Sequence, residues 1–278
     1  MGTKTWIGGS TAGKNSLNVA ANWSPSGVPS GSDDIYFTHR STSSVLNDLA
    51  TLSTVNGELH VQSGYHALIG SSTGPNYFEM KPSKIFFNGV RESFIDAKAS
   101  TGVVHVTNTG GGSFTGAGLT VKGTALARIN MQNGNVAIAT NPGETSTVAE
   151  IEMTSAGLLM LGSGASWTNI SIYGGTVSAA SGSTNAVVNL FGGVFSATEN
   201  CKLKELNTHN GVAFWGGDQN IAAITMRGGT VDATLSGQNR TVTNFRVYQG
   251  SFKYDPNVIA VTNFLEADTP VSLNTIKI

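Results

Sequence analysis

The sequence predicts an all-β protein that folds as a single-stranded parallel β-helix, a β-solenoid, behind an N-terminal capping segment. The first observation is an internal repeat: four segments align without gaps as "ISIYGGTV" (170–177), "VNLFGGVF" (188–195), "ITMRGGTV" (224–231) and "FRVYQGSF" (245–252). The second is composition, because 35 of the 278 residues are Gly, and Ser, Thr and Asn recur every few positions. These residue types disfavour helix interiors, so long helices are not expected.

The repeat has a period close to that of known solenoid folds. With the second small residue of each segment as a marker, successive markers lie 18, 18, 18 and 21 residues apart: Gly175, Gly193, Gly211, Gly229 and Gly250. Upstream, Gly134 and Ala156 continue the series with spacings of 22 and 19. A repeat of about 20 residues is typical of solenoids, in which neighbouring turns share one continuous core.

Each repeat alternates like a strand. In "ITMRGGTV", Ile224 and Met226 face one way while Thr225 and Arg227 face the other. The glycine pair then turns the chain, because Gly tolerates positive φ. We expect one inward column and a glycine at the following corner of each turn; the column consists of Ile172, Leu190, Met226 and Val247. The aliphatic spacing of left-handed hexapeptide solenoids is missing, which favours a right-handed helix.

The chain divides into an N-terminal cap, residues 1–45, and a solenoid of roughly ten turns, residues 46–278. A first turn without a cover would expose apolar side chains and an unpaired strand edge. Trp6 and Trp23 supply large apolar area, and Pro29 cannot donate a hydrogen bond to a ladder, so these three residues are the predicted cap. The segment "SSTGPNYFEMKPS" (71–83) is too irregular for a turn of the repeat, and we expect a loop there.

The first 40 or so residues contain "TWIGG" and "NVAANWSPSGVPSGSDDIYF". This segment resembles one found at the start of repeats in large bacterial autotransporter-like and other surface β-solenoid proteins. The matching residues are Trp6, Gly8, Gly9, Asn22, Trp23, Gly27, Pro29, Asp33, Asp34, Ile35 and Phe37, with Ile7 inserted between Trp6 and the glycines. In its compactness the chain also resembles phage head-decoration, head-fibre and tail-fibre β-solenoids. The resemblance implies a fold and an exposed location, and no chemistry.

Composition excludes several classes of protein. A net charge of −1 with 12% charged residues leaves no basic face for nucleic acid. There is no run of about 18 apolar residues to span a membrane, and the start "MGTKTWIGG" lacks the apolar region of a secretion signal. The stretch "GGSTAGKN" has the glycine and lysine spacing of a phosphate-binding loop, but Asn15 stands where Mg²⁺ needs Ser or Thr. We therefore expect no nucleotide or other cofactor.

No catalytic or metal site is predicted. Glycosidases and lyases need paired acidic groups or a base among acidic ligands on one face. Glu150 and Glu152 project outward together, about 7 Å apart along the strand, but no Asp, Lys or Arg occupies the equivalent place in adjacent turns. The lone Cys201 is expected in the core, and the histidines lie in scattered turns without a converging ligand set: His39, His60, His66, His105 and His209.

One outward position of the repeat carries large side chains, namely Tyr173, Phe191, Arg227 and Tyr248. We interpret this column as an interaction stripe covered by a neighbouring subunit, a loop or a glycan; a homotrimer is the favoured arrangement. Phe214, Trp215 and Tyr254 are further aromatic candidates for a sugar-binding strip.

An exposed solenoid without a secretion signal suits a virion protein made in the host cytoplasm. The predicted function is a non-enzymatic phage structural protein on the virion surface, as a capsid decoration or head fibre, with other virion proteins as partners. One alternative is a tail spike or receptor-binding protein that acts on host polysaccharide. The other is a fragment of a bacterial surface adhesin.

Overall fold

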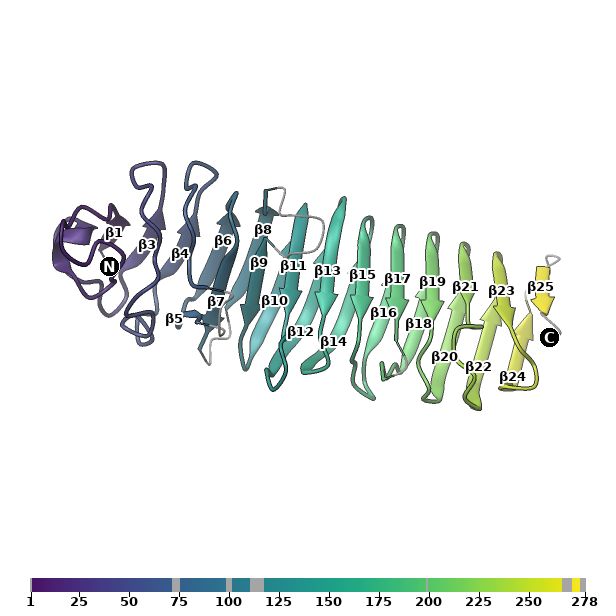
Figure 1. Ribbon diagram of the computed structural model, residues 1–278. Helices are drawn as coiled ribbons and strands as arrows, with labels where there is room; N and C mark the ends of the chain where they lie inside the picture. The colour runs from purple at the N-terminus through teal and green to yellow at the C-terminus, as the bar shows by residue number, and fades with distance from the viewer. Residues whose placement is uncertain are drawn as a thin grey trace. The chain divides into compact units, whose positions relative to one another are not determined.

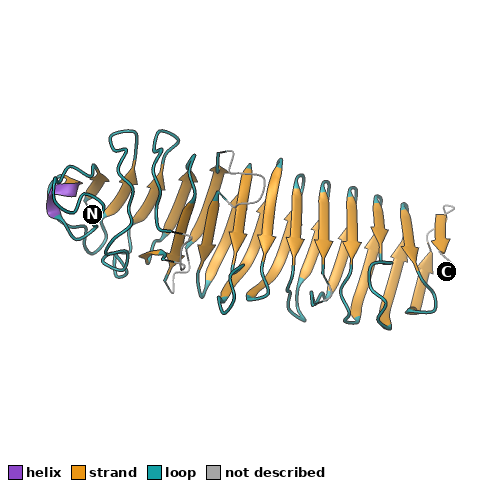
Figure 2. Cartoon of the chain, viewed as in Figure 1, coloured by secondary structure: helices purple, strands orange, loops and turns teal. Residues whose placement is uncertain are grey.

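The computed structural model describes residues 2–71, 76–98, 102–110, 118–198, 200–266 and 272–275. It confirms the predicted fold class, an all-β parallel solenoid. Among the described residues the only helix is a single 3-10 turn, η1 (Ala20–Asn22), drawn in purple in Figure 2. The chain forms two compact units: unit 1 is residues 1–139 with 144–148, and unit 2 is residues 140–143 with 149–278.

Unit 1 contains two ladders of strands, which pair in parallel except for β2 at the end of the first (Figure 1). The first runs in the order β2-β1-β3-β4-β6-β8-β10, comprising β1 (Thr3–Trp6), β2 (Trp23–Ser24), β3 (Asp34–Phe37), β4 (Glu58–Val61), β6 (Lys84–Asn88), β8 (Val103–Asn108) and β10 (Leu126–Met131). The second comprises β5 (Phe78–Met80), β7 (Ser93–Ala97), β9 (Leu119–Lys122) and β11 (Gly134–Ile138). The strand β12 (Ser146–Met153) contains the boundary between the units.

Unit 2 repeats the same plan with more regular turns. Its first ladder comprises β14 (Ala165–Ile172), β16 (Val187–Leu190), β18 (Glu205–Thr208), β20 (Ile221–Met226), β22 (Arg240–Val247) and β24 (Ile259–Glu266). Its second comprises β13 (Gly157–Leu161), β15 (Thr176–Ala179), β17 (Val194–Ala197), β19 (Val212–Trp215), β21 (Thr230–Asp232), β23 (Ser251–Tyr254) and β25 (Ser272–Thr275). Strands that neighbour each other in a ladder therefore belong to successive turns.

The predicted inward column is present in unit 2. Register pairs Ile172 with Leu190, Leu190 with Thr208, Thr208 with Met226, and Met226 with Val247. All five side chains are fully buried. The one polar member, Thr208, is satisfied because its hydroxyl donates to the carbonyl of Gly228 at 3.0 Å. Burying an aliphatic side chain stabilises by about 1.5–3 kcal/mol, so such columns supply the main driving force for stacking.

The corner glycines take the left-handed conformation that the repeat predicted. Gly175, Gly193, Gly211 and Gly229 have φ of +77°, +75°, +84° and +79°. Stacking adds a second constraint: a Cβ on Gly193 would lie 2.4 Å from the carbonyl oxygen of Gly175 in the turn before it. Only glycine satisfies both the backbone angle and this close approach.

One marker in the predicted series was wrong. Ala156 is not a corner residue; Gly157 is, with φ of +151°. The register pairs Leu158 with Thr176, so Gly157 lies beside Gly175. The turn after β12 holds one more residue than the turns that follow, and this extra residue displaced the alignment.

Two tryptophans lie buried at the N-terminal end of unit 1. Trp6 and Trp23 are buried and meet edge to face, with ring centroids 5.2 Å apart. Their indole N–H groups donate to the carbonyls of Ser43 and Leu17, each at 3.0 Å. Pro29 is also buried. The antiparallel β2 covers one edge of β1, and the other edge of β1 pairs in parallel with β3. The regular ladder therefore begins within the segment assigned to the cap.

The prediction of a loop over residues 71–83 was wrong at residues 78–80, and residues 72–75 of that range lie outside the described residues. Residues 78–80 form β5, which pairs in parallel with β7 through Phe78 and Ile95. Phe78 and Met80 are fully buried, so this short segment follows the inward alternation of the other turns. A strand of three residues is too short to stand out as a pattern in the sequence.

Candidate interaction surfaces

The outward column predicted in unit 2 contains two groups of side chains in contact. The Tyr173 and Phe191 rings lie 4.7 Å apart and almost parallel, and Phe191 stacks in turn on His209 at 4.6 Å. Further along, the Arg227 guanidinium lies 5.8 Å from the centre of the Tyr248 ring. Each residue precedes its corner glycine by two positions, which is why consistent register stacks them. We call these five residues the outer stripe; His209 is the member that the sequence analysis left out.

The stacking determines which parts of the rings in the outer stripe remain accessible to a partner. Parallel rings cover one another's faces, so Phe191 is partly buried between its neighbours. Tyr173 and Tyr248 remain 50% and 46% exposed. Sugars and apolar partners prefer ring faces, and stacked rings turn mainly their edges outward. The stripe therefore covers itself in part, and it needs an external partner less than the sequence pattern suggested.

A second stack occupies the first ladder of unit 1. Tyr36, His60, Phe86 and His105 lie face to face, with successive ring centroids 4.3, 4.8 and 5.1 Å apart. The Asn130 amide continues the column, with its Nδ2 3.3 Å from His105 Nδ1. We call this column the His60 ladder. His60 and His105 lie in different turns, as expected, but on the same outward column, a register that turns of unequal length hid in the sequence.

Glu58 anchors one edge of the His60 ladder. Its carboxylate lies 3.1 Å from His60 Nε2 and 3.1 Å from Lys84 Nζ. The hydrogen bond from Lys84 is the main cause that lowers the pKa of Glu58, with a smaller contribution from His60. Glu58 is therefore held as a charged group that orients its neighbours.

The second ladder of unit 1 gathers a charged cluster that the sequence did not predict. Register places Glu79, Asp96 and Lys122 in one outward column. The nearly buried Asp96 carboxylate lies 3.1 Å from Lys98 and 3.5 Å from Lys122, and Lys98 also binds Glu79 at 3.0 Å. These hydrogen bonds to Glu79 and Asp96 raise the pKa of Lys98.

An aromatic residue extends this cluster. Lys122 Nζ lies 4.1 Å above the centre of the Tyr77 ring, and the Tyr77 hydroxyl donates to Glu144. Cation–π and ion-pair contacts of this kind fix side chains in place. Since a lysine neutralises both Glu79 and Asp96, the arrangement favours a structural network over a general base.

The other residues considered for chemistry are placed as follows. Ile151 and Met153 are buried, so Glu150 and Glu152 project outward as expected. Burial raises the pKa of the Cys201 thiol to about 12, which fits a core residue. Within the described ranges, no three His, Cys, Asp or Glu side chains meet in a way that could hold a metal ion.

Two of the aromatic residues suggested for a sugar strip are engaged elsewhere. Trp215 is 1% exposed and belongs to an inward column, so it is excluded from any surface strip. Tyr254 stacks on the buried Phe252, with ring centroids 5.0 Å apart. Phe214 alone projects outward, half-exposed, between Ser196 and Asp232 of neighbouring turns.

Comparison with known proteins adds no family. No family model, no curated protein and no solved structure matches this chain. In the described part of the chain, none of the helical structure has the length and apolarity that a membrane crossing requires. The functional argument therefore rests on the residues and their geometry.

Proposed function

We propose that this protein is a non-enzymatic structural component of a phage virion, displayed on the virion surface as a capsid decoration or head fibre. The observation that carries the proposal is that outward side chains contact one another from turn to turn. They form ladders from turn to turn: stacked rings, ion pairs, and amide contacts such as Asn207 to Asn189 and Asn263 to Asn244, both 3.1 Å. Such ladders add stability to each turn and suit a rigid display scaffold.

The alternatives make different demands on the surface. A spike that cleaves polysaccharide needs two carboxyl groups about 5–9.5 Å apart that are available for proton transfer. In this protein Glu58, Glu79 and Asp96 are each engaged by a lysine. A bacterial adhesin would share the scaffold and differ in location. Mass spectrometry of purified virions tests the proposal directly: the chain is expected among the virion proteins, and its absence from them would overturn the assignment.

The first prediction concerns catalysis. The double variant Glu150→Gln with Glu152→Gln should behave as the native protein, because Gln keeps the size of the outward side chains and removes only their charge. Neither protein is expected to release reducing ends from host capsular polysaccharide. Release by the native protein that the double change abolishes would instead establish a glycosidase or lyase.

The second prediction concerns assembly. We propose that the exposed edges of Tyr173, Tyr248 and Arg227 are buried in a homotrimer, so light scattering should give three times the 28.8 kDa of one chain. The pair Tyr173→Ser and Tyr248→Ser should then give a monomer. The matched control is Tyr36→Ser in the His60 ladder, which should leave the mass unchanged. A native mass near 28.8 kDa, with the stripe variants retaining stability and virion attachment, would refute the trimer.

A further inference from the structure

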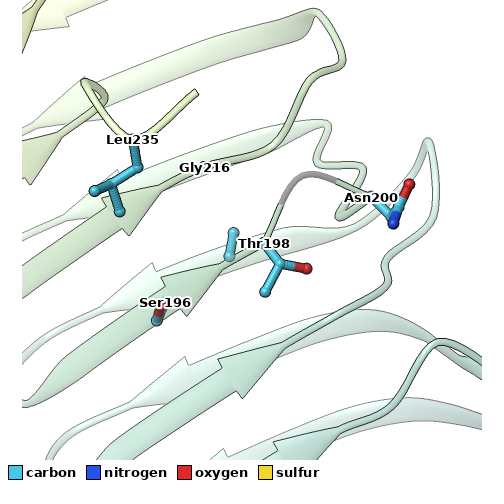
Figure 3. Close-up of a pocket in the computed structure, with 6 residues that line it drawn as sticks. Ser196, Thr198, Asn200, Gly216 and Leu235 are labelled. Carbon is cyan, nitrogen blue, oxygen red and sulfur yellow. The ribbon is translucent and has the colours of Figure 1, made fainter. Parts of the chain in front are cut away.

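A pocket of about 370 Å³ opens on the outer side of the second ladder of unit 2 (Figure 3). It lies where β17 ends, beside the loops that follow β19 and β21. Its described lining consists of Ser196, Ala197, Thr198, Asn200, Gly216 and Leu235. The volume falls at the small end of the range of ligand pockets, about 300–1,000 Å³, which suits a ligand of one or two small rings.

The polar side chains of the pocket have free hydrogen-bonding capacity. Ser196 projects from β17, Thr198 follows the strand, and Asn200 lies in the loop beyond it (Figure 3). Within the described part of the chain, no group hydrogen-bonds to these three side chains. Two hydroxyls and one amide together offer both donors and acceptors.

The opposite side of the pocket is apolar. Leu235 is 58% exposed, the most exposed large hydrophobic side chain among the described residues. Gly216 forms a bare stretch of backbone beside it; a Cβ there would lie 3.7 Å from the Cβ of Leu235. The pocket therefore has hydrogen-bonding groups on one side and an apolar surface on the other.

The buried Arg240 holds the backbone on the Gly216 and Leu235 side of the pocket. Its guanidinium, 2% exposed, donates to the carbonyl oxygens of Trp215, Gly217 and Ala233 and lies 4.3 Å from the centre of the Trp215 ring. These bonds tie the residues on both sides of Gly216 to the segment that leads to Leu235. A wall that is already held in place loses little entropy when a ligand binds against it.

We infer that this pocket binds a neutral sugar unit, a hexose or N-acetylhexosamine at the end or along the side of a glycan. A sugar ring presents hydroxyls on its rim and C–H groups on one face, and the pocket offers partners for both. All of its described lining residues are uncharged, so these residues offer a ligand hydrogen bonds and apolar contact and give an ion no counter-charge. The inference goes beyond the proposed function and does not depend on it, because the isolated protein can be tested.

The test is a titration of the full chain, followed by NMR chemical shifts, with D-glucose, D-galactose, N-acetyl-D-glucosamine and N-acetyl-D-galactosamine, and with D-glucuronate as the charged probe. We expect at least one neutral sugar to bind with a Kd of about 1 mM, a strength usual for so small a contact, and D-glucuronate to bind at least tenfold more weakly. No saturable binding of any neutral sugar up to about 20 mM would overturn the inference.

Variants locate the binding. Asn200→Ala and Leu235→Ala should each weaken it at least fivefold, and Thr198→Trp, which fills the pocket, should abolish it. Both alanine changes remove surface side chains, so the melting temperature should stay native and separate loss of binding from loss of folding. The matched control is Leu68→Ala, an exposed leucine in unit 1, which should bind as the native protein does. Binding that survives all three pocket changes would place the sugar elsewhere and refute the site.

Discussion

Gly193→Ala is expected to lower the free energy of unfolding by about 3 kcal/mol or more, and Gly193→Val by more still. The φ of +75° places any L-residue in the left-handed region, which costs about 1–2 kcal/mol. The new Cβ would also lie 2.4 Å from the Gly175 carbonyl oxygen and 2.9 Å from the Gly174 carbonyl carbon. Both are backbone atoms of the adjacent turn, so no side chain can swing away, and forced overpacking adds about 1–3 kcal/mol.

A second glycine of unit 2 separates the two causes. Gly143 has nearly the same φ, +79°, but nothing lies within 4 Å of its Cβ position. Gly143→Ala should therefore cost only the conformational part, about 1 kcal/mol. Urea unfolding of both variants measures the difference. Equal losses in the two would mean that contact between turns adds nothing and that the stacking distances are wrong.

Arg240→Met should also destabilise strongly, by about 3 kcal/mol. The change leaves the carbonyls of Trp215, Gly217 and Ala233 without their shared donor and removes the cation from the Trp215 ring. Burial lowers the pKa of the Arg240 guanidinium, an effect that nearby Asp218 opposes. Burying the charged guanidinium therefore costs desolvation free energy. A Met of similar length avoids part of that cost but makes none of the three hydrogen bonds.

Two controls accompany this variant. Arg246→Met changes an exposed arginine of the same strand, β22, and should alter stability by less than about 0.5 kcal/mol. Arg240→Lys keeps the charge but loses the planar fork, so its stability should fall between the native protein and Arg240→Met. Unfolding midpoints in urea give the order. If Arg240→Met proved as mild as Arg246→Met, the arginine would not hold the loops together.

Register explains where sequence reasoning succeeded. From Gly157 to Gly229 the corner glycines recur every 18 residues, so strand, corner and inward column could be assigned by counting. Ile172, Leu190 and Met226 were correctly placed in one column, and Tyr173 and Phe191 in another. With a constant period, equivalent residues of successive turns lie in equivalent environments, and four of the five residues of the outer stripe could be predicted from the sequence for that reason.

Unit 1 shows where counting fails. The step from Ile35 to Leu59 differs in length from the step from Leu59 to Ile85, yet both pairs are in register. Turns of unequal length hide which residues become neighbours. The His60 ladder and the column of Glu79, Asp96 and Lys122 were missed for this reason.

The sequence alone determined the class of fold, the cap tryptophans and the regular columns of unit 2, because a glycine corner and an alternating strand are local requirements repeated along the chain. Tertiary structure alone decided which side chains from unequal turns meet, since loops of any length can return a strand to the same register. It also decided the pocket beside Leu235 and the role of Arg240, for both depend on loops from three turns that converge in space and share no motif.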